Sequence, residues 1–491
     1  MSTDNEEKIE QNRYEDNSTT VEDGIRDSKQ ETFHKKSKAE KSLQRKIDLL
    51  FLPLVLCIIM VQFADKSALA ISAILGFYQD TGISGSQFSW LGSIFYLGYL
   101  IYQVPNQFFV QWFPIGRYLG VCIIIWGIVM LCIAVGQTFS QLAGLRFLLG
   151  IFEASCLPCI YMIVANLYRR QDHAFYFSVI TMCQGLGGML ADFVTAGIAN
   201  MGNQQGIMMW RWNHIIFGAV TVALGILSFF FLMDDPKSKL LRLTPEQETI
   251  VDERTRDNAV IRSRKFNPKH ALEALSEPRY YLIALGMISS NLQVGGLVIF
   301  GAQFLQSLGD FTATATIFLK VPGGVMGVIF TLAAGLISRR TQQIMYTGIL
   351  MSMISLAGCL VLACVPTGAV KLLGYYLSAG MGGAMALFPA TTGSNVSGYS
   401  KKIFYNATLV AAATVGQFIG PLVMLEREKP RYLTGMIVFV VGDVVTIACF
   451  IILRILMVRE NKRRIANPSS QTYDVNLGLT DREDRNFLYK L

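Results

Sequence analysis

Long apolar runs separated by short polar segments make up most of this 491-residue chain. A helix of about 20 apolar residues is long enough to cross the hydrocarbon core of a bilayer. Twelve such runs occur, so the pattern predicts an all-α membrane protein with twelve transmembrane helices. Their approximate ranges are 47–75, 87–110, 117–136, 141–167, 174–199, a sixth that ends near 233, then 279–307, 312–337, 344–365, 370–394, 402–425 and 433–458.

The polar segments divide these runs into two sets of six. We expect a disordered cytoplasmic tail over 1–46, an N-terminal six-helix bundle over 47–233 and a C-terminal one over 279–458, followed by a cytoplasmic tail over 459–491. The loop 234–278 joins the bundles. Within it, Thr244 is a capping residue, Pro245 suits a first helical position and Gln247 follows three residues after the cap. These signals predict a charged surface helix from 245 to about 264.

Basic residues lie in clusters between the apolar runs rather than in one patch. The chain is 52% hydrophobic and 16% charged with a net charge of +8, which is too apolar for a soluble domain of this size. Clusters such as Arg339-Arg340 and Lys401-Lys402 fall in alternate loops, and by the positive-inside rule they place both termini in the cytoplasm. The loop after the eleventh run, with three basic residues, is an exception. The distribution argues against a nucleic-acid partner and for a multi-pass protein of the lipid bilayer.

Charged residues inside the apolar runs are the candidate functional groups. Arg146 and Glu153 lie seven residues apart in the fourth run, so both side chains leave the same helix face about 10 Å apart along the axis. The first run carries Asp65 and Lys66. Charges at membrane depth are costly and usually mark a substrate or ion pathway. The alternative is that these residues form two structural ion pairs that fix helix packing.

Other intramembrane polar residues are open to two interpretations. Asn291 in the seventh run either lines a cavity or makes an interhelical hydrogen bond. Gln417, beside a Gly-Pro break in the eleventh run, is a cavity candidate. Lys320 is most simply explained by snorkelling to the outer interface, with contact to the cavity as the alternative. Asp192 and Asp443 look like lone acids, and Asp443 in the last run is expected to be structural.

Several familiar chemistries have no support in the sequence. The nine cysteines all fall in apolar runs and give no disulfide framework. We interpret Cys156-x-x-Cys159 as coincidental and expect Pro158 to bend the fourth helix. The four histidines do not form a metal set, and no phosphate-binding P-loop occurs. The sequence therefore predicts no enzyme, no cofactor and no metal.

Seven short blocks together resemble one family of carriers. They are Phe63-Ala64-Asp65-Lys66-Ser67, Tyr102-Gln103-Val104-Pro105-Asn106, Arg146-x3-Gly150-x2-Glu153-Ala154-x3-Pro158, Leu167-Tyr168-Arg169-Arg170, Trp210-Arg211-Trp212-Asn213, Gly416-Gln417-Phe418-Ile419-Gly420-Pro421 and Lys429-Pro430-Arg431-Tyr432-x2-Gly435. This set is similar to the anion:cation symporter family of the major facilitator superfamily, and especially to its fungal allantoate-permease-like branch. The resemblance covers about 45–460 and implies two six-helix bundles with the substrate between them.

The chain departs from the wider superfamily at its cytoplasmic loop motif. Gln111, Trp112 and Pro114 stand where that motif has an acid, a base and a glycine, and Arg339 stands where the repeated motif has its acid. The inner gate therefore cannot use the usual Asp–Arg contact. Lys66 replaces a more common arginine, so the bidentate grip of a guanidinium on a carboxylate is lost there.

The resemblance implies a proton-coupled transporter of a small organic anion, such as a carboxylate, ureide acid or vitamin acid. Asp65 and Glu153 are then the proton-coupling residues, and Lys66 and Arg146 the cations for the substrate. Tyr99 and Gln184 match cavity positions of the family, and Asn291 and Gln417 complete the candidate set. Topology puts Arg146 in the outer half and Glu153 near the midplane, so these four charges predict one exchange site with Glu153 as the proton carrier.

Other functions remain open on the sequence alone. An exporter or uniporter of similar solutes differs in proton dependence and direction of flux. A nutrient sensor on a carrier fold would favour longer tails than those present. We expect a monomer whose partners are protons, the anion and lipid, in the plasma membrane in preference to an internal membrane.

Overall fold

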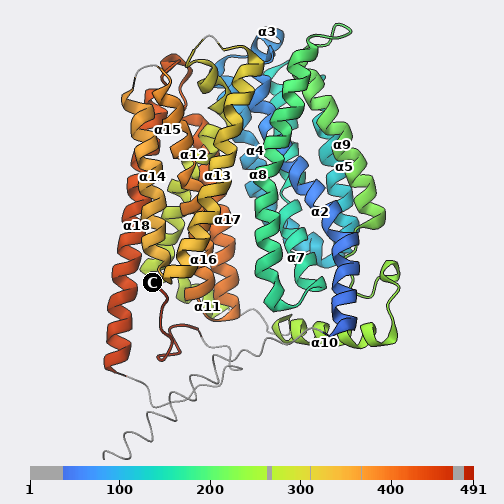
Figure 1. Cartoon of the computed structure of the whole chain (residues 1–491), viewed down its shortest axis with the longest axis vertical. Helices are drawn as coiled ribbons and strands as arrows, with labels where there is room; N and C mark the ends of the chain where they lie inside the picture. Colours follow the sequence, from blue (N-terminus) through green and yellow to red (C-terminus); the bar gives the residue numbers. More distant parts are fainter. Residues whose placement is uncertain (1–36, 263–267, 310, 366–367, 468–479) are drawn as a thin grey trace, which may run out of the picture.

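The chain folds into two bundles of long helices that stand side by side (Figure 1). A computed structural model describes residues 37–262, 268–309, 311–365, 368–467 and 480–491. Most of the predicted tail 1–46 therefore lies outside the described residues. The helices of the first bundle are α2 (Lys38–Ser72), α3 (Phe77–Thr81), α4 (Gly85–Trp112), α5 (Ile115–Ile133), α6 (Phe139–Glu153), α7 (Cys156–Leu167), α8 (Arg170–Met201) and α9 (Met209–Phe231).

The second bundle follows a connecting segment that holds one 3₁₀-helix and two α-helices. The connecting elements are η1 (Lys239–Leu241), α10 (Pro245–Arg262) and α11 (Pro268–Leu275). The second bundle contains α12 (Pro278–Gln306), α13 (Ala313–Thr341), α14 (Ile344–Cys364), α15 (Val370–Ser378), α16 (Gly380–Asn395), α17 (Tyr399–Leu422), η2 (Glu426–Glu428) and α18 (Leu433–Ala466).

Twelve positions in this arrangement correspond to the twelve predicted spans. Nine of the described helices are long and apolar enough to cross a membrane, with α6 and α7 counted as one span of 29 residues. The other three positions belong to α4, α8 and the nearly continuous pair α15 and α16. Two of these less apolar helices, α4 and α8, pack on the opposite bundle, against α17 and α13. Helices at a protein interface need less apolar surface than helices that face lipid.

The fourth span breaks in the middle, next to a candidate functional residue. α6 ends at Glu153, and α7 begins at Cys156. Pro158 lies four residues after Ala154, and a proline both lacks an amide hydrogen and clashes with the carbonyl four residues earlier. The predicted bend at Pro158 is thus confirmed as a helix break, which places Glu153 in the last turn of α6.

The predicted start of the surface helix in the connecting segment is also confirmed. α10 begins at Pro245, and its first turn holds a reciprocal pair of contacts. The Gln247 amide donates to Thr244 Oγ1 (3.4 Å), and the Thr244 amide donates to Gln247 Oε1 (3.2 Å). This capping box satisfies amide groups that the helix itself leaves free. α10 packs against α2 and α7, which makes it part of the first bundle.

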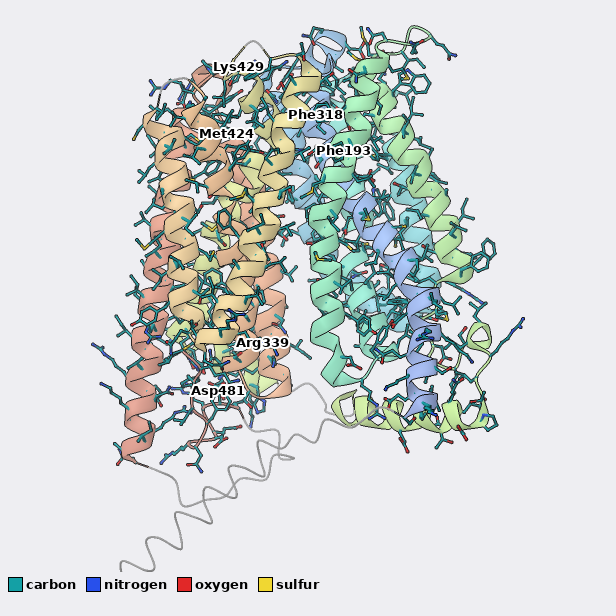
Figure 2. All side chains as sticks on the ribbon, in the orientation of Figure 1. Phe193, Phe318, Arg339, Met424, Lys429 and Asp481 are labelled. Carbon is teal, nitrogen blue, oxygen red and sulfur yellow. The ribbon has the colours of Figure 1, made fainter. Side chains whose placement is uncertain are left out.

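The C-terminal residues are more ordered than their polar composition suggests. α18 continues to Ala466, eight residues beyond the expected end of the span. Residues 480–491 then pack on the second bundle, where Asp481 is fully buried (Figure 2). Its carboxylate accepts from Lys401 Nζ (2.8 Å), Arg279 Nη2 (2.7 Å) and the Tyr489 hydroxyl (2.8 Å). Burial would raise the pKa of Asp481, but Arg279 and Lys401 outweigh it and hold the pKa below its usual range.

Candidate functional site

A buried ion pair joins two of the predicted site residues. Lys66 Nζ of α2 lies 3.1 Å from Glu153 Oε1 of α6, inside the first bundle. The ammonium also lies 5.6 Å from the centre of the Tyr99 ring on α4 and 5.3 Å from that of Phe63. Aromatic rings attract a cation through their negative faces. Lys66 is therefore held between one carboxylate and two rings.

Two glycines bring the helices of this site into close contact. A Cβ atom on Gly150 of α6 would lie 2.0 Å from the Phe95 carbonyl oxygen, and one on Gly98 of α4 would lie 2.3 Å from that of Phe147. Only glycine permits backbones to approach so closely. The crossing of α4 and α6 at these glycines places Tyr99 beside the last turn of α6, where Glu153 lies.

Arg146 does not form the ion pair that its spacing from Glu153 suggests. Its Nε donates to the Leu91 carbonyl oxygen of α4 (3.3 Å), and its guanidinium lies 5.2 Å from the centre of the Phe95 ring. The side chain is only 2% exposed. Arg146 therefore braces α6 against α4, and Lys66 from another helix is the partner of Glu153.

Asp65 of α2 is fully buried. Its Oδ2 accepts a hydrogen bond from Thr221 Oγ1 of α9 (3.3 Å). The neighbouring residue Lys66 points toward α6, so this Asp-Lys pair reaches two different helices. With all four groups ionised, Asp65, Lys66, Arg146 and Glu153 together carry no net charge.

Exposure separates the candidate site residues into two groups. Lys66 keeps 16% of its side chain exposed, whereas Glu153 keeps none. Tyr99 is 9% exposed, and Gln184 of α8 and Gln417 are half-buried. Of the ion pair, only Lys66 therefore keeps exposed surface, and Glu153 is covered completely.

The candidates in the second bundle contact one another across two helices. Gln417 Nε2 of α17 donates to Asn291 Oδ1 of α12 (2.8 Å), and Asn291 is fully buried. This is the interhelical hydrogen bond that the sequence left as an alternative for Asn291. Asp443 accepts from Ser355 Oγ (3.1 Å), which agrees with the structural role expected for that acid.

The structure corrects the interpretation of Lys320 and Asp192. Lys320 Nζ of α13 donates to Asp192 Oδ1 of α8 at 2.8 Å, with side chains only 13% and 5% exposed. Lys320 is therefore not a snorkelling residue, and Asp192 is not a lone acid. The pair joins the two bundles, because α8 belongs to the first bundle and α13 to the second.

Further contacts between the bundles surround this pair, at the end of the molecule away from α10 and α11. Phe193 and Phe318 approach with ring centres 6.2 Å apart (Figure 2). Tyr78 donates to Gln303 Oε1 (3.1 Å), and the Ser86 amide donates to Glu426 Oε2 (3.2 Å). We call these contacts, with Lys320–Asp192, the outer seal, because the positive-inside rule predicts that this end faces outward. Toward the other end the ribbons of the two bundles diverge (Figure 1).

The sequence contained a usable signal for part of this seal. Asp192 and Lys320 are oppositely charged, and each lies in the outer half of its span. Two such costly charges at similar depth are expected to pair. Nothing in the sequence indicated that Gln62 also belongs to the candidate site. It is fully buried one turn before Lys66 and lies next to Glu153. A single glutamine in an apolar helix gives no comparable signal.

Comparison with known proteins identifies similar chains over nearly the whole length. A family model described as Major Facilitator Superfamily matches residues 54–423. The allantoate permease of Saccharomyces cerevisiae is 29% identical over 471 residues, which cover 92% of this chain and 87% of the permease. The thiamine pathway transporter of the same yeast is 26% identical, with 98% and 92% covered.

A solved structure has the same fold at low sequence identity. A bacterial homologue of the human lysosomal transporter Spinster superposes with a TM-score of 0.67 at 17% identity, and the match covers 86% of this chain and 98% of that one. The two six-helix bundles described above are thus the architecture of a known class of transporters.

Proposed function

This chain belongs to the major facilitator superfamily, and from that membership we propose that it imports a small organic anion together with a proton. That the protein is a multi-pass membrane transporter rather than an enzyme follows from its fold and its relatives. The coupling ion and the solute are our proposal. The observation that carries it is the Lys66–Glu153 ion pair, of which only the lysine is accessible.

Charge balance explains why a proton would accompany an anion. The four charges of the site sum to zero, and an uncompensated charge in a low-dielectric interior costs several kcal/mol. Binding of one anion makes the site negative, and one proton restores neutrality. An anion and a proton bound together therefore cross at the lowest electrostatic cost.

The ion pair supplies a route for that exchange. While Glu153 is ionised, it occupies Lys66 Nζ at 3.1 Å and competes with any solute anion. A proton on Glu153 removes that competition and leaves the ammonium to the substrate. When the substrate departs, Lys66 again attracts an ionised Glu153, and the proton is released.

The outer seal suggests the conformational half of the cycle. All the contacts that define it join the bundles at the end away from α10 and α11. If that end faces outward, as the positive-inside rule predicts, the structure corresponds to an inward-facing state. Import then requires the seal to open while the opposite end closes.

The cation at the centre favours a solute with one carboxylate. A lysine ammonium is a compact charge that does not require the planar, two-oxygen geometry that arginine recognises. Allantoate is the first candidate, because a permease of that name is among the full-length relatives. We further propose uptake across the plasma membrane.

Uptake by purified protein in proteoliposomes tests this proposal. We expect wild-type protein to accumulate labelled allantoate faster at an external pH of about 5 than at about 7.5. Neutral allantoin, which lacks the carboxylate, and cationic thiamine should not compete. Accumulation that ignores both pH and a proton uncoupler would refute the coupling.

Two substitutions assign the roles of the ion pair. Glu153→Gln should remove the pH dependence while exchange of internal for external allantoate continues, because Lys66 is then permanently available. Lys66→Gln should abolish both activities. Asp443→Asn is the matched control, since Asp443 is an equally buried acid that contacts Ser355 within the second bundle. A Glu153→Gln protein with unchanged pH dependence would exclude Glu153 as the proton carrier.

A further inference from the structure

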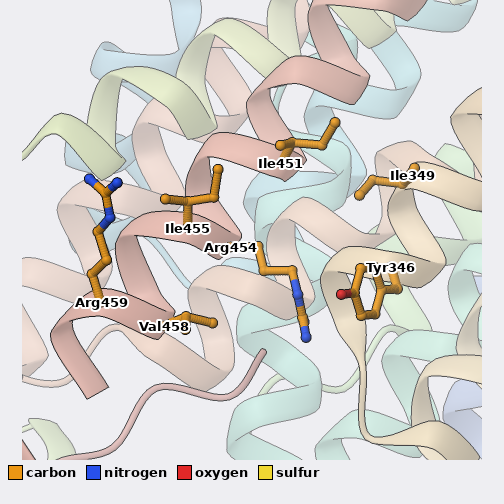
Figure 3. A pocket seen from close by; sticks show the side chains of 7 residues that line it. All are labelled: Tyr346, Ile349, Ile451, Arg454, Ile455, Val458 and Arg459. Carbon is orange, nitrogen blue, oxygen red and sulfur yellow. The ribbon is translucent and has the colours of Figure 1, made fainter. Parts of the chain in front are cut away.

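A groove of about 380 Å³ lies between α14 and α18 on the second bundle (Figure 3). In Figure 1, these helices stand at the edge of the molecule farthest from the first bundle, so the groove is separate from the candidate transport site. Isoleucines form much of it, and Ile451 and Ile455 are 41% and 44% exposed. The surface beside the groove therefore faces lipid.

Two arginines give this apolar groove a charged rim. Arg454 and Arg459 both line it, and none of the lining residues is acidic. Nearby Glu460 contacts Arg464 (3.0 Å) and Arg463 (3.7 Å) instead. Within the described residues, no carboxylate lies at ion-pair distance from Arg454 or Arg459. Two positive charges thus remain available at the edge of an apolar surface.

The guanidinium of Arg454 is fixed in position. It lies 3.7 Å from the centre of the Tyr346 ring in the first turn of α14, and its Nη1 donates to Gln343 Oε1 (2.8 Å). One hydrogen bond and one ring contact leave most of the five N–H donors of the arginine unused. A fixed guanidinium with spare donors matches the oxygen atoms of a phosphate.

The position of the groove along the membrane normal suits a lipid headgroup. Arg454 and Arg459 precede the basic end of α18, at the same end of the molecule as Arg339 (Figure 2). This is the end that the positive-inside rule predicts to be cytoplasmic, where the leaflet is rich in anionic lipid. The isoleucines lie farther into the membrane than Arg459.

From these observations we propose that the groove between α14 and α18 binds an anionic phospholipid of the cytoplasmic leaflet. The headgroup phosphate contacts the fixed guanidinium of Arg454, Arg459 adds positive charge at the rim of the groove, and an acyl chain lies along Ile451 and Ile349. Basic pockets between transmembrane helices at this depth are typical lipid headgroup sites. The bound lipid would hold the peripheral helix α18 against α14.

Lipid titration of the full-length protein tests the site. Detergent-purified protein is titrated with phosphatidylinositol or phosphatidylcholine in mixed micelles, and bound lipid is counted by native mass spectrometry. We expect the wild type to prefer phosphatidylinositol, and each arginine to contribute about fivefold to this preference. The double variant Arg454→Gln/Arg459→Gln should lose about 25-fold.

Two further variants guard against misfolding and against a bulk charge effect. Arg459→Gln alone changes an exposed side chain, so it should fold normally and lose about fivefold. Lys462→Gln/Arg463→Gln removes the same charge as the double variant from α18 but outside the groove, and it should bind like the wild type. The proposal fails if wild-type protein shows no preference, if the groove variants keep it, or if the control pair loses as much as they do.

Discussion

The ion pair between Asp192 and Lys320 should control whether the outer seal is open or closed. At 2.8 Å and an effective dielectric constant of about 20, Coulomb's law gives an attraction of about 6 kcal/mol. Desolvation of two nearly buried groups offsets much of it, and a hydrogen bond to a charged group has a net value of about 2 kcal/mol. When the bundles separate, this contact is lost. The pair thus favours the closed seal about 30-fold.

Asp192→Asn removes the charge while it keeps a similar shape. We expect the population ratio of closed to open seal to fall about 30-fold. The substitution removes the ion pair, and this pair stabilises only the closed state. The charge swap Asp192→Lys/Lys320→Asp should restore much of that ratio. Asp443→Asn is again the control, since Asp443 contacts Ser355 within one bundle.

Spin-label distances can measure this equilibrium. Labels at Gln204→Cys and Lys429→Cys would report the separation of the two bundles at the outer end, after replacement of the exposed cysteines Cys57, Cys132 and Cys364. Asp192→Asn should increase the population at long distance, and the charge swap should reduce it. If the distance distribution of Asp192→Asn equals that of the wild type, the ion pair does not stabilise the closed seal.

Two further substitutions test how the helices and the C-terminal segment are held. Gly150→Ala should lower the melting temperature strongly, because its Cβ would lie 2.0 Å from the Phe95 oxygen. The control Gly144→Ala should be neutral or slightly stabilising, because no neighbouring atom lies within 4 Å of the added Cβ. Equal melting temperatures of the two variants would contradict the close crossing of α4 and α6. Asp481→Asn should expose 480–491 to hydrogen exchange at a cost of about 3 kcal/mol, whereas exposed Arg485→Gln should not. Folding lowers the pKa of Asp481. Its contribution to the stability of the segment is therefore fully present above the pKa of about 3.9 in the unfolded chain, and it is lost only as the pH falls through the lower pKa of the folded state. Residues 480–491 should thus stay protected from hydrogen exchange at pH 5.

The fold was largely predictable because a bilayer leaves few solutions. An apolar run of 20 residues must satisfy its backbone internally, so the runs identify the helices directly. Local signals also worked at helix ends, as the capping box at Thr244 and the break before Pro158 show. Each of these depends on residues within a few positions of one another.

The pairing of the site residues was beyond such local signals. The seven-residue spacing of Arg146 and Glu153 suggested that they act together, yet Glu153 contacts Lys66 of another helix. Which helix faces which is decided by close crossings such as those at Gly98 and Gly150. Glycine is too common in this sequence for those two positions to stand out.

Segments that dock through charges were missed for a different reason. Residues 480–491 are polar, and polar composition usually predicts a disordered tail. They pack because Asp481 meets Lys401 and Arg279, which lie 80 and 202 positions away. Likewise, Lys320 considered alone fits the snorkelling rule, and only the three-dimensional contact with Asp192 excludes it.

The two intramembrane ion pairs differ in what can break them, and this difference suggests how binding and access are coupled. Lys66 and Glu153 belong to the same bundle, so a rigid rotation of one bundle against the other leaves their contact intact. Asp192 and Lys320 belong to different bundles, so the same rotation must separate them. In the cycle that we propose, protons and substrate act on the first pair, and the conformational change acts on the second. Neither pair contains a residue of the other, so in this proposal coupling comes from the cost of closing the bundles around a site that carries net charge. The empty site and the site that holds both anion and proton are neutral, whereas an anion or a proton bound alone leaves a net charge.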